Sequence, residues 1–189
     1  MRSRSLADFF AQIVRSTTFH NPNVKVNKYY KHPLLIPLMQ QIIISETDFQ
    51  KVRKLIKENT GKKIIFSTSD DELNRKILEK EHIDILLLML SNRKDRMKQR
   101  DSGFNQVLAK IAKSKEVTIG INLDEILNAD KSDKAEILAR VRQNIKLCNK
   151  NKLKMEFVSQ KNEKDKHDLK ALGLSLGMPT WMTKEIINC

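Results

Sequence analysis

The chain has 189 residues, of which 40% are hydrophobic and 31% are charged, so it can bury a core and is not a charge-driven disordered chain. The longest uninterrupted apolar run, residues 85–90, is far shorter than the roughly 18 residues that span a bilayer, which argues against a polytopic membrane protein. Basic residues outnumber acidic ones by 13 charges, a balance typical of a protein with an anionic partner such as RNA, DNA or a membrane surface.

The first 41 residues do not follow the pattern of the rest of the chain. A helical stripe of apolar residues comprises Leu6, Phe9, Phe10, Ile13 and Val14. Arginines flank this stripe, as in a mitochondrial presequence. The alternative, which we prefer, is an amphipathic helix that covers the remainder of the domain.

From residue 41 onward, apolar runs alternate with segments of helical periodicity. Strands are predicted at residues 42–45, 63–68, 83–90, 117–122 and 155–159. Helices are predicted at residues 47–59, 69–78, 104–112, 123–127, 134–151 and 169–176. Ser69 and Glu72 form a sequence signature for capping the second helix, and Gly61 and Gly177 mark helix ends.

Five strand–helix repeats predict βαβ units and a parallel sheet. We expect one α/β domain over residues 1–189, TIM-barrel-like and incomplete or compact, with an open doubly wound sheet as the alternative. In both folds the functional surface lies at the carboxyl ends of the strands.

The sequence offers no catalytic or metal-binding constellation. Its four histidines are isolated, and neither a glycine-rich phosphate loop nor a nucleophile elbow occurs. Cys148 lies on the apolar stripe of a predicted helix and is interpreted as a core residue, and two cysteines cannot form a disulfide framework. We therefore expect a binding protein without a cofactor of its own, in a reducing compartment such as the cytoplasm.

Positive charge is concentrated in three stretches, the first of which is residues 1–40 with a net charge of +5. Residues 91–115 carry a net charge of +6 and residues 131–166 another +6, whereas residues 41–90 are balanced. The stretch 91–115 opens with a loop containing Arg93, Lys94, Arg96, Lys98 and Arg100. Because this loop follows the carboxyl end of a buried strand, we expect its cations to bind phosphate groups, a solvated charge run being the alternative.

The stretch 131–166 contains a long predicted helix with cations spaced by four residues. Arg142, Lys146 and Lys150 share one face, about 100° from the apolar stripe, and Arg140 lies elsewhere on the same helix. Aromatic residues make up only 5% of the chain, so platforms for stacking single-stranded bases are scarce. Folded RNA recognised through its backbone is the better match.

The residues from Arg100 to Lys110, which read RDSGFNQVLAK, resemble the central block of archaeal ribonuclease P protein component 3. The apolar strand 117–122, the Glu125-Ile126-Leu127 turn and the Arg140-x-Arg142-x-Asn144 pattern follow in the family's order. The resemblance covers about residues 42–180. Gln106 stands where the family often has histidine, and the segment after Ser159 is richer in charged residues than is usual there.

The resemblance implies a TIM-barrel-like protein subunit of ribonuclease P, the ribonucleoprotein endonuclease that removes the 5′ leader from precursor tRNA. Catalysis would be carried by the RNA, with Mg²⁺ held on the RNA and no catalytic or metal-binding residue in this chain. Expected partners are the ribonuclease P RNA and protein component 2, in a heterotetramer, with no membrane contact. The RNA-binding residues would be Arg93, Lys94, Arg96, Lys98, Arg100, Arg140, Arg142 and Lys146. Asp101 or Ser102 would cap the helix after the basic loop.

Two other interpretations stay open at this point. One is a barrel-fold, metal-dependent phosphoesterase, for which the scattered histidines provide little support. The other is a generic basic protein bound to a nucleic acid or a membrane surface, with the first helix as its anchor.

Overall fold

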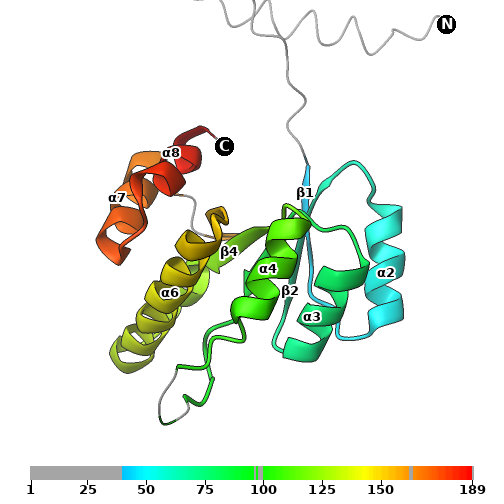
Figure 1. Cartoon of the computed structure of the whole chain (residues 1–189), viewed down its shortest axis with the longest axis horizontal. Coiled ribbons are helices and arrows are strands. Elements are labelled where there is room, and N and C mark those ends of the chain that lie inside the picture. Colours follow the sequence, from blue (N-terminus) through cyan, green and yellow to red (C-terminus); the bar gives the residue numbers. More distant parts are fainter. Residues whose placement is uncertain (1–39, 96, 98–99, 162–163, 189) are drawn as a thin grey trace, which may run out of the picture. The chain divides into compact units, whose positions relative to one another are not determined.

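The computed structural model describes residues 40–95, 97, 100–161 and 164–188, and all of them belong to one compact unit. The predicted N-terminal helix, Arg96, Lys98 and Cys189 lie outside the described residues. Strands and helices alternate as predicted (Figure 1). The strands are β1 (Gln41–Ile44), β2 (Lys63–Thr68), β3 (Ile85–Leu88), β4 (Thr118–Asn122) and β5 (Met155–Val158). The helices are α2 (Phe49–Glu58), α3 (Asp71–Lys80), α4 (Gln106–Ser114), α5 (Leu123–Asn128), α6 (Lys131–Asn151), α7 (Lys166–Leu176) and α8 (Thr180–Asn188).

The five strands form one parallel sheet in the order β1-β2-β3-β4-β5. Each strand pairs with its neighbour in sequence, so the order never reverses as it does in a doubly wound sheet. Right-handed crossovers in this order place successive helices on the same face of the sheet, and Figure 1 shows α2, α3, α4 and α6 on one face. The fold is therefore α/β and TIM-barrel-like, and the doubly wound alternative was wrong.

The sheet has an apolar layer on each face. The larger core lies between the sheet and its helices, where β2 contributes Ile64 and Phe66 and α6 contributes Val141 and Ile145. The opposite face carries a smaller cluster of Ile65, Ile85, Leu87 and Val158, with Ile43 packed against it. A sheet that is apolar on both faces explains why the strands read as continuous hydrophobic runs without alternation.

Local signals place most helix ends where the sequence predicts them, with two corrections. Gly177 ends α7 with φ of 97°, a conformation that glycine adopts without strain. The cap of α3 is Asp70 rather than Ser69, because the Asp70 side chain accepts from the backbone N–H groups of Glu72 and Leu73. Asn105, rather than Asp101 or Ser102, caps α4.

Helix α8, the last element of the described chain, was not predicted from the sequence. Its Met182 is buried in the main core. Cys148 is buried on α6 as predicted, and burial raises the pKa of its thiol to about 12. Among the described residues, no helix combines the length and the hydrophobicity needed to cross a membrane.

Candidate nucleic-acid interface

The loop between β3 and α4, residues 89–105, is anchored by two arginines. The Arg93 side chain is 11% exposed, donates from Nε to the Met89 carbonyl (2.6 Å) and forms a two-pronged ion pair with Asp71 of α3 (2.8 and 3.1 Å). The hydrogen bond to Asp71 is the main reason that the pKa of Arg93 is raised. Arg93 therefore ties the loop to α3.

Arg140 of α6 anchors the same loop from the other side. Its side chain is 2% exposed, and it donates to the backbone carbonyls of Leu90 (3.1 Å) and Arg93 (2.9 Å). It also donates to the carboxylates of Asp95 (3.0 Å) and Glu136 (3.0 Å). A guanidinium enclosed in this way has no free surface for a phosphate. Arg93 and Arg140 thus hold the loop in place, and either could contact a phosphate only at the expense of these contacts.

Asp95 sits between a buried and an exposed arginine. It accepts from Arg140 and from Arg100 Nη1 (3.0 Å), and from the backbone N–H of Asp101 (3.0 Å). That backbone N–H, followed by the two guanidinium groups, holds the pKa of Asp95 below its ordinary value. The carboxylate thus stays ionised and partly neutralises Arg100, whose side chain is 46% exposed.

The segment Asp101-Ser102-Gly103, which the family resemblance singled out, is structural. Ser102 is buried and its hydroxyl lies 2.7 Å from Oδ1 of Asn144 on α6. Gly103 has φ of 65°, and a Cβ atom there would lie 2.6 Å from Nη2 of Arg93 and would overlap the Asp71 carboxylate. Only glycine fits between this ion pair and the loop backbone.

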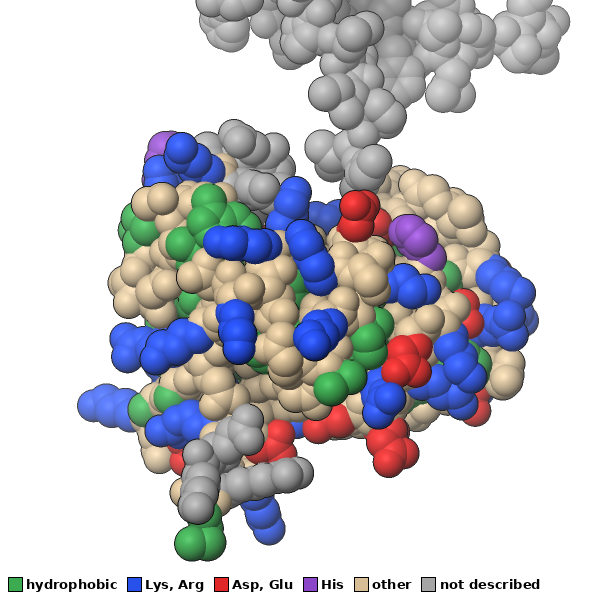
Figure 2. Space-filling model, in the orientation of Figure 1, with side chains coloured by type: hydrophobic (Ala, Val, Ile, Leu, Met, Phe, Trp, Pro, Cys, Tyr) green, Lys and Arg blue, Asp and Glu red, His purple; other side chains and the backbone are tan. Residues whose placement is uncertain are grey.

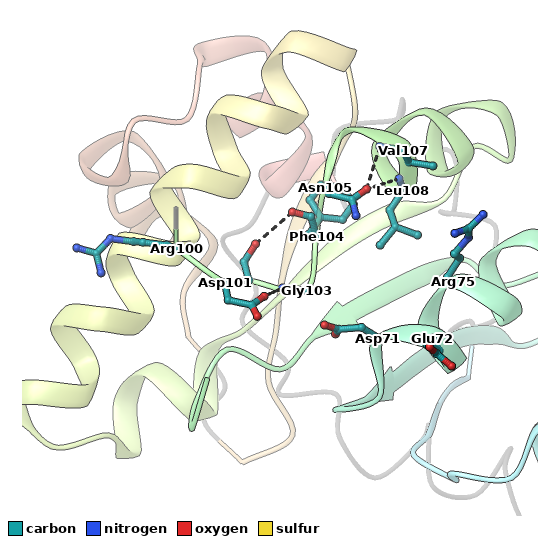
Figure 3. Close-up of a pocket in the computed structure, with 11 residues that line it drawn as sticks. Asp71, Glu72, Arg75, Arg100, Asp101, Gly103, Phe104, Asn105, Val107 and Leu108 are labelled. Carbon is teal, nitrogen blue, oxygen red and sulfur yellow. Dashed lines mark hydrogen bonds between the residues drawn. The ribbon is translucent and has the colours of Figure 1, made fainter. Parts of the chain in front are cut away.

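A hollow of about 400 Å³ opens beside this segment, between α3 and α4 (Figure 3). Carboxylates of Asp71, Glu72 and Asp101 line it together with Arg75 and Arg100. Figure 3 shows the Arg100 side chain directed away from Asp71 and Glu72. The mixed charge of this hollow, with three carboxylates, is unfavourable for a phosphate group.

Of the predicted RNA-binding residues, four are both described and exposed. Lys94 and Arg100 lie on the loop, and Arg142 and Lys146 lie on the outer face of α6. Sequence reasoning missed a second set of exposed cations, Lys110 and Lys113 of α4 with Lys115 just after it. The charge count could have identified these lysines, because half of the net charge of residues 91–115 lies after the loop.

The carboxyl ends of the strands surround a smaller hollow of about 220 Å³. Its polar lining includes Ser45, Ser67, Asn122 and Gln160, and Asp124 accepts from the Ser159 hydroxyl (2.8 Å) and from the Gln160 backbone N–H (2.7 Å). Within the described ranges, histidine, cysteine and carboxylate side chains do not gather into a group that could hold a metal ion.

Comparisons with known proteins support the resemblance seen in the sequence. No protein-family model matches the chain. The chain is 26% identical over 136 residues to ribonuclease P protein component 3 of Methanococcus vannielii, covering 71% of this chain and 56% of that protein. It is 28% identical over 109 residues to the protein of the same name from Methanococcus maripaludis strain C7, covering 57% of this chain and 44% of that protein. The chain thus spans about half the length of the curated relatives it matches.

A solved structure shares the fold. A chain in the cryo-EM structure of archaeal ribonuclease P with mature tRNA superposes with a TM-score of 0.65 and 22% identity, covering 99% of this chain and 74% of that chain. At this identity the match concerns the fold alone. Together with the sequence matches, it confirms that this chain is similar to ribonuclease P protein component 3, as the Arg100–Lys110 block indicates.

Proposed function

We propose that this chain is a protein subunit of ribonuclease P, which binds the catalytic RNA and supports removal of the 5′ leader from precursor tRNA in the cytoplasm. The observation that carries the proposal is the sequence similarity to proteins named ribonuclease P protein component 3, which extends over 71% of the chain in one relative. Partners in this proposal are the ribonuclease P RNA and protein component 2, and precursor tRNA is contacted indirectly.

The chain's own residues divide between two tasks in this proposal. Arg93 and Arg140 hold the described part of the loop against α3 and α6, and other cations neutralise RNA phosphates. The phosphate-binding residues are Lys94, Arg96, Lys98, Arg100, Arg142 and Lys146. Catalysis and Mg²⁺ belong to the RNA, and the protein lowers the repulsion between phosphates that the folded RNA brings together.

Reconstitution tests the proposed function directly. Precursor tRNA would be incubated with ribonuclease P RNA and companion proteins at low Mg²⁺, with and without this chain. We expect the chain to restore 5′-leader cleavage and to be inactive on its own. Unchanged cleavage would contradict the proposed function, and cleavage by the chain alone would contradict the assignment of catalysis to the RNA.

The loop contribution is tested by replacing Arg96, Lys98 and Arg100 with Ala. If each neutralises one phosphate, the slope of log K against log salt should flatten by about 1 per residue. Arg100 should contribute least to the change in slope, because Asp95 already neutralises part of its charge. An unchanged slope, in a variant that unfolds at the wild-type urea concentration, would remove the loop from the interface.

A further inference from the structure

Helices α4 and α6 present a basic surface outside the loop, and its Arg142 end adjoins the loop, since the neighbouring Gln143 donates to the Arg100 carbonyl (3.0 Å). We define this α4–α6 face by its exposed cations, which are Lys110, Lys113, Lys115, Arg142, Lys146 and Lys150. Figure 2 shows Lys and Arg side chains spread over this side of the molecule, whereas most Asp and Glu side chains lie below it and toward α3, with one acidic group near the top.

The two helices are joined edge to edge, so their cations belong to one surface. Gln106, at the start of α4, donates to Asn151 at the end of α6 (2.6 Å). Lys113 donates from its ammonium to the backbone carbonyl of Lys152, just after α6 (3.0 Å). The Lys113 charge is therefore held at the junction of the two helices.

The two helices contribute no acidic residue to this face, although the exposed Glu116 directly follows Lys115. Helix α4 contains no Asp or Glu, and neither does α6 from residue 137 to residue 151. Within the described residues, Arg142, Lys146 and Lys150 form no ion pair, in contrast to Arg75, which pairs with Glu79 on α3 (2.8 Å). The charge of the three α6 cations is thus not neutralised by an ion pair within the described residues.

The α6 cations form a regular row. Arg142, Lys146 and Lys150 follow one another at four-residue intervals, so each step along the helix axis is about 6 Å and the row extends about 12 Å. Helix α6 packs against the core through Val141, Ile145 and Cys148, which are all fully buried. A row of cations on a rigid helix matches a repetitive anionic partner better than a single small anion.

The residue types on the face favour RNA over protein as the partner, and double-stranded RNA over single-stranded RNA. Five of its six cations are lysines, a residue type depleted in protein–protein interfaces, whereas lysine serves well as a point charge for phosphate. Neither α4 nor α6 contains an aromatic residue on which an unpaired base could stack. Trp181 of α8 lies close to the end of α6, but it is already engaged within the chain. Its indole N–H donates to Asn149 (3.2 Å), and the Lys152 ammonium lies over its ring. Double-stranded RNA is recognised through shape and backbone phosphates, which needs no such platform.

We propose that the α4–α6 face binds the phosphate backbone of a double-stranded RNA segment, through residues other than those of the loop 91–100. This inference rests on the proposed function and deepens it, because it names the surface and the form of RNA. Arg142, Lys146 and Lys150 contact one backbone strand, and the α4 lysines extend the contact along the same segment.

The test uses a blunt RNA duplex of about 20 base pairs and a single strand of the same length, with the full chain. The face variant combines Arg142→Gln, Lys146→Gln and Lys150→Gln. The matched control combines Lys51→Gln, Lys54→Gln and Lys57→Gln, which removes three exposed charges from α2. We expect the slope of log K against log salt for the duplex to become less negative by about 3 in the face variant and to stay unchanged in the control.

Several outcomes would overturn the inference. An equal change of slope in both variants would mean that net charge alone drives binding, and an unchanged slope in the face variant would exclude the face. If the face substitutions weaken binding of the single strand only, the duplex is not the ligand. If the face binds an acidic protein and no RNA, RNA is not the ligand. The leader-cleavage assay keeps the two proposals apart. If the chain stimulates cleavage but the face variant keeps the wild-type slope for the duplex, the role of the face is contradicted and the proposed function stands. If the face variant changes the slope but the chain does not stimulate cleavage, the proposed function is contradicted and duplex binding by the face stands.

Discussion

Arg140 and Arg142 are two residues apart on one helix and have different surroundings. Arg140 is enclosed by the carbonyls of Leu90 and Arg93 and by two carboxylates, and Arg142 is exposed on the outer face of α6. A planar guanidinium with five donors suits the buried position, because it can satisfy several backbone acceptors at once. The same residue type thus organises the loop at one position and is available to a partner at the other.

The first prediction concerns this pair. Arg140→Met keeps much of the apolar volume but leaves two buried carbonyls without donors, so it should lower the free energy of unfolding by about 2–4 kcal/mol. Arg142→Met, the control, should change it by less than about 0.5 kcal/mol, because the side chain is exposed. Urea unfolding of the two variants measures both values. Equal stabilities would mean that Arg140 does not hold the loop.

At the level of elements, the loop and α6 are also joined through a buried hydroxyl–amide pair. The Ser102 hydroxyl and the Asn144 side chain are each 2% exposed or less, and their hydrogen bond connects positions 42 residues apart in sequence. Both residues lie in segments that carry the family resemblance. Their role in this structure is to fix the start of α4 against α6, and so to set the basic face.

A double-mutant cycle tests this connection. Ser102→Ala should cost about 1–3 kcal/mol of unfolding free energy, because the Asn144 amide is left buried without its partner. Asn144→Ala should cost a similar amount, and the double variant should cost clearly less than the sum of the two. Additive losses, measured by urea unfolding, would show that the two side chains do not act as a pair.

At the level of the whole molecule, the loop and the α4–α6 face are proposed as two contacts on one rigid scaffold. If the two sets of cations contact different phosphates, their effects on binding should add. In a variant that combines the loop substitutions with the face substitutions, the salt slope should therefore become less negative by about 6, the sum of the two effects, while Lys94 and the α4 lysines still contribute. Fluorescence titration with ribonuclease P RNA at several salt concentrations gives the slopes. A combined loss no larger than either single loss would mean that both sets contact the same phosphates.

Much of the fold was predictable because the signals are local. Continuous apolar runs such as Ile85–Leu88 predict buried parallel strands, and the spacing of Ile137, Val141 and Ile145 predicts the buried side of α6. Five repeats predict the parallel sheet, and the block around Arg100–Lys110 predicts the similarity to ribonuclease P protein component 3. Helix α8 was missed because its apolar residues, read alone, show no clear helical period.

The candidate site was predictable only in part. The sequence by itself determined the strand–helix alternation, the charge excess and its three stretches, because these depend on neighbours along the chain. The tertiary structure decided that Arg93 and Arg140 are enclosed whereas Arg142 and Lys146 are exposed, and it joined the lysines of α4 to those of α6. Which face of a helix meets a loop 40 or more residues away depends on packing across the sheet, and no local pattern of charges encodes that contact.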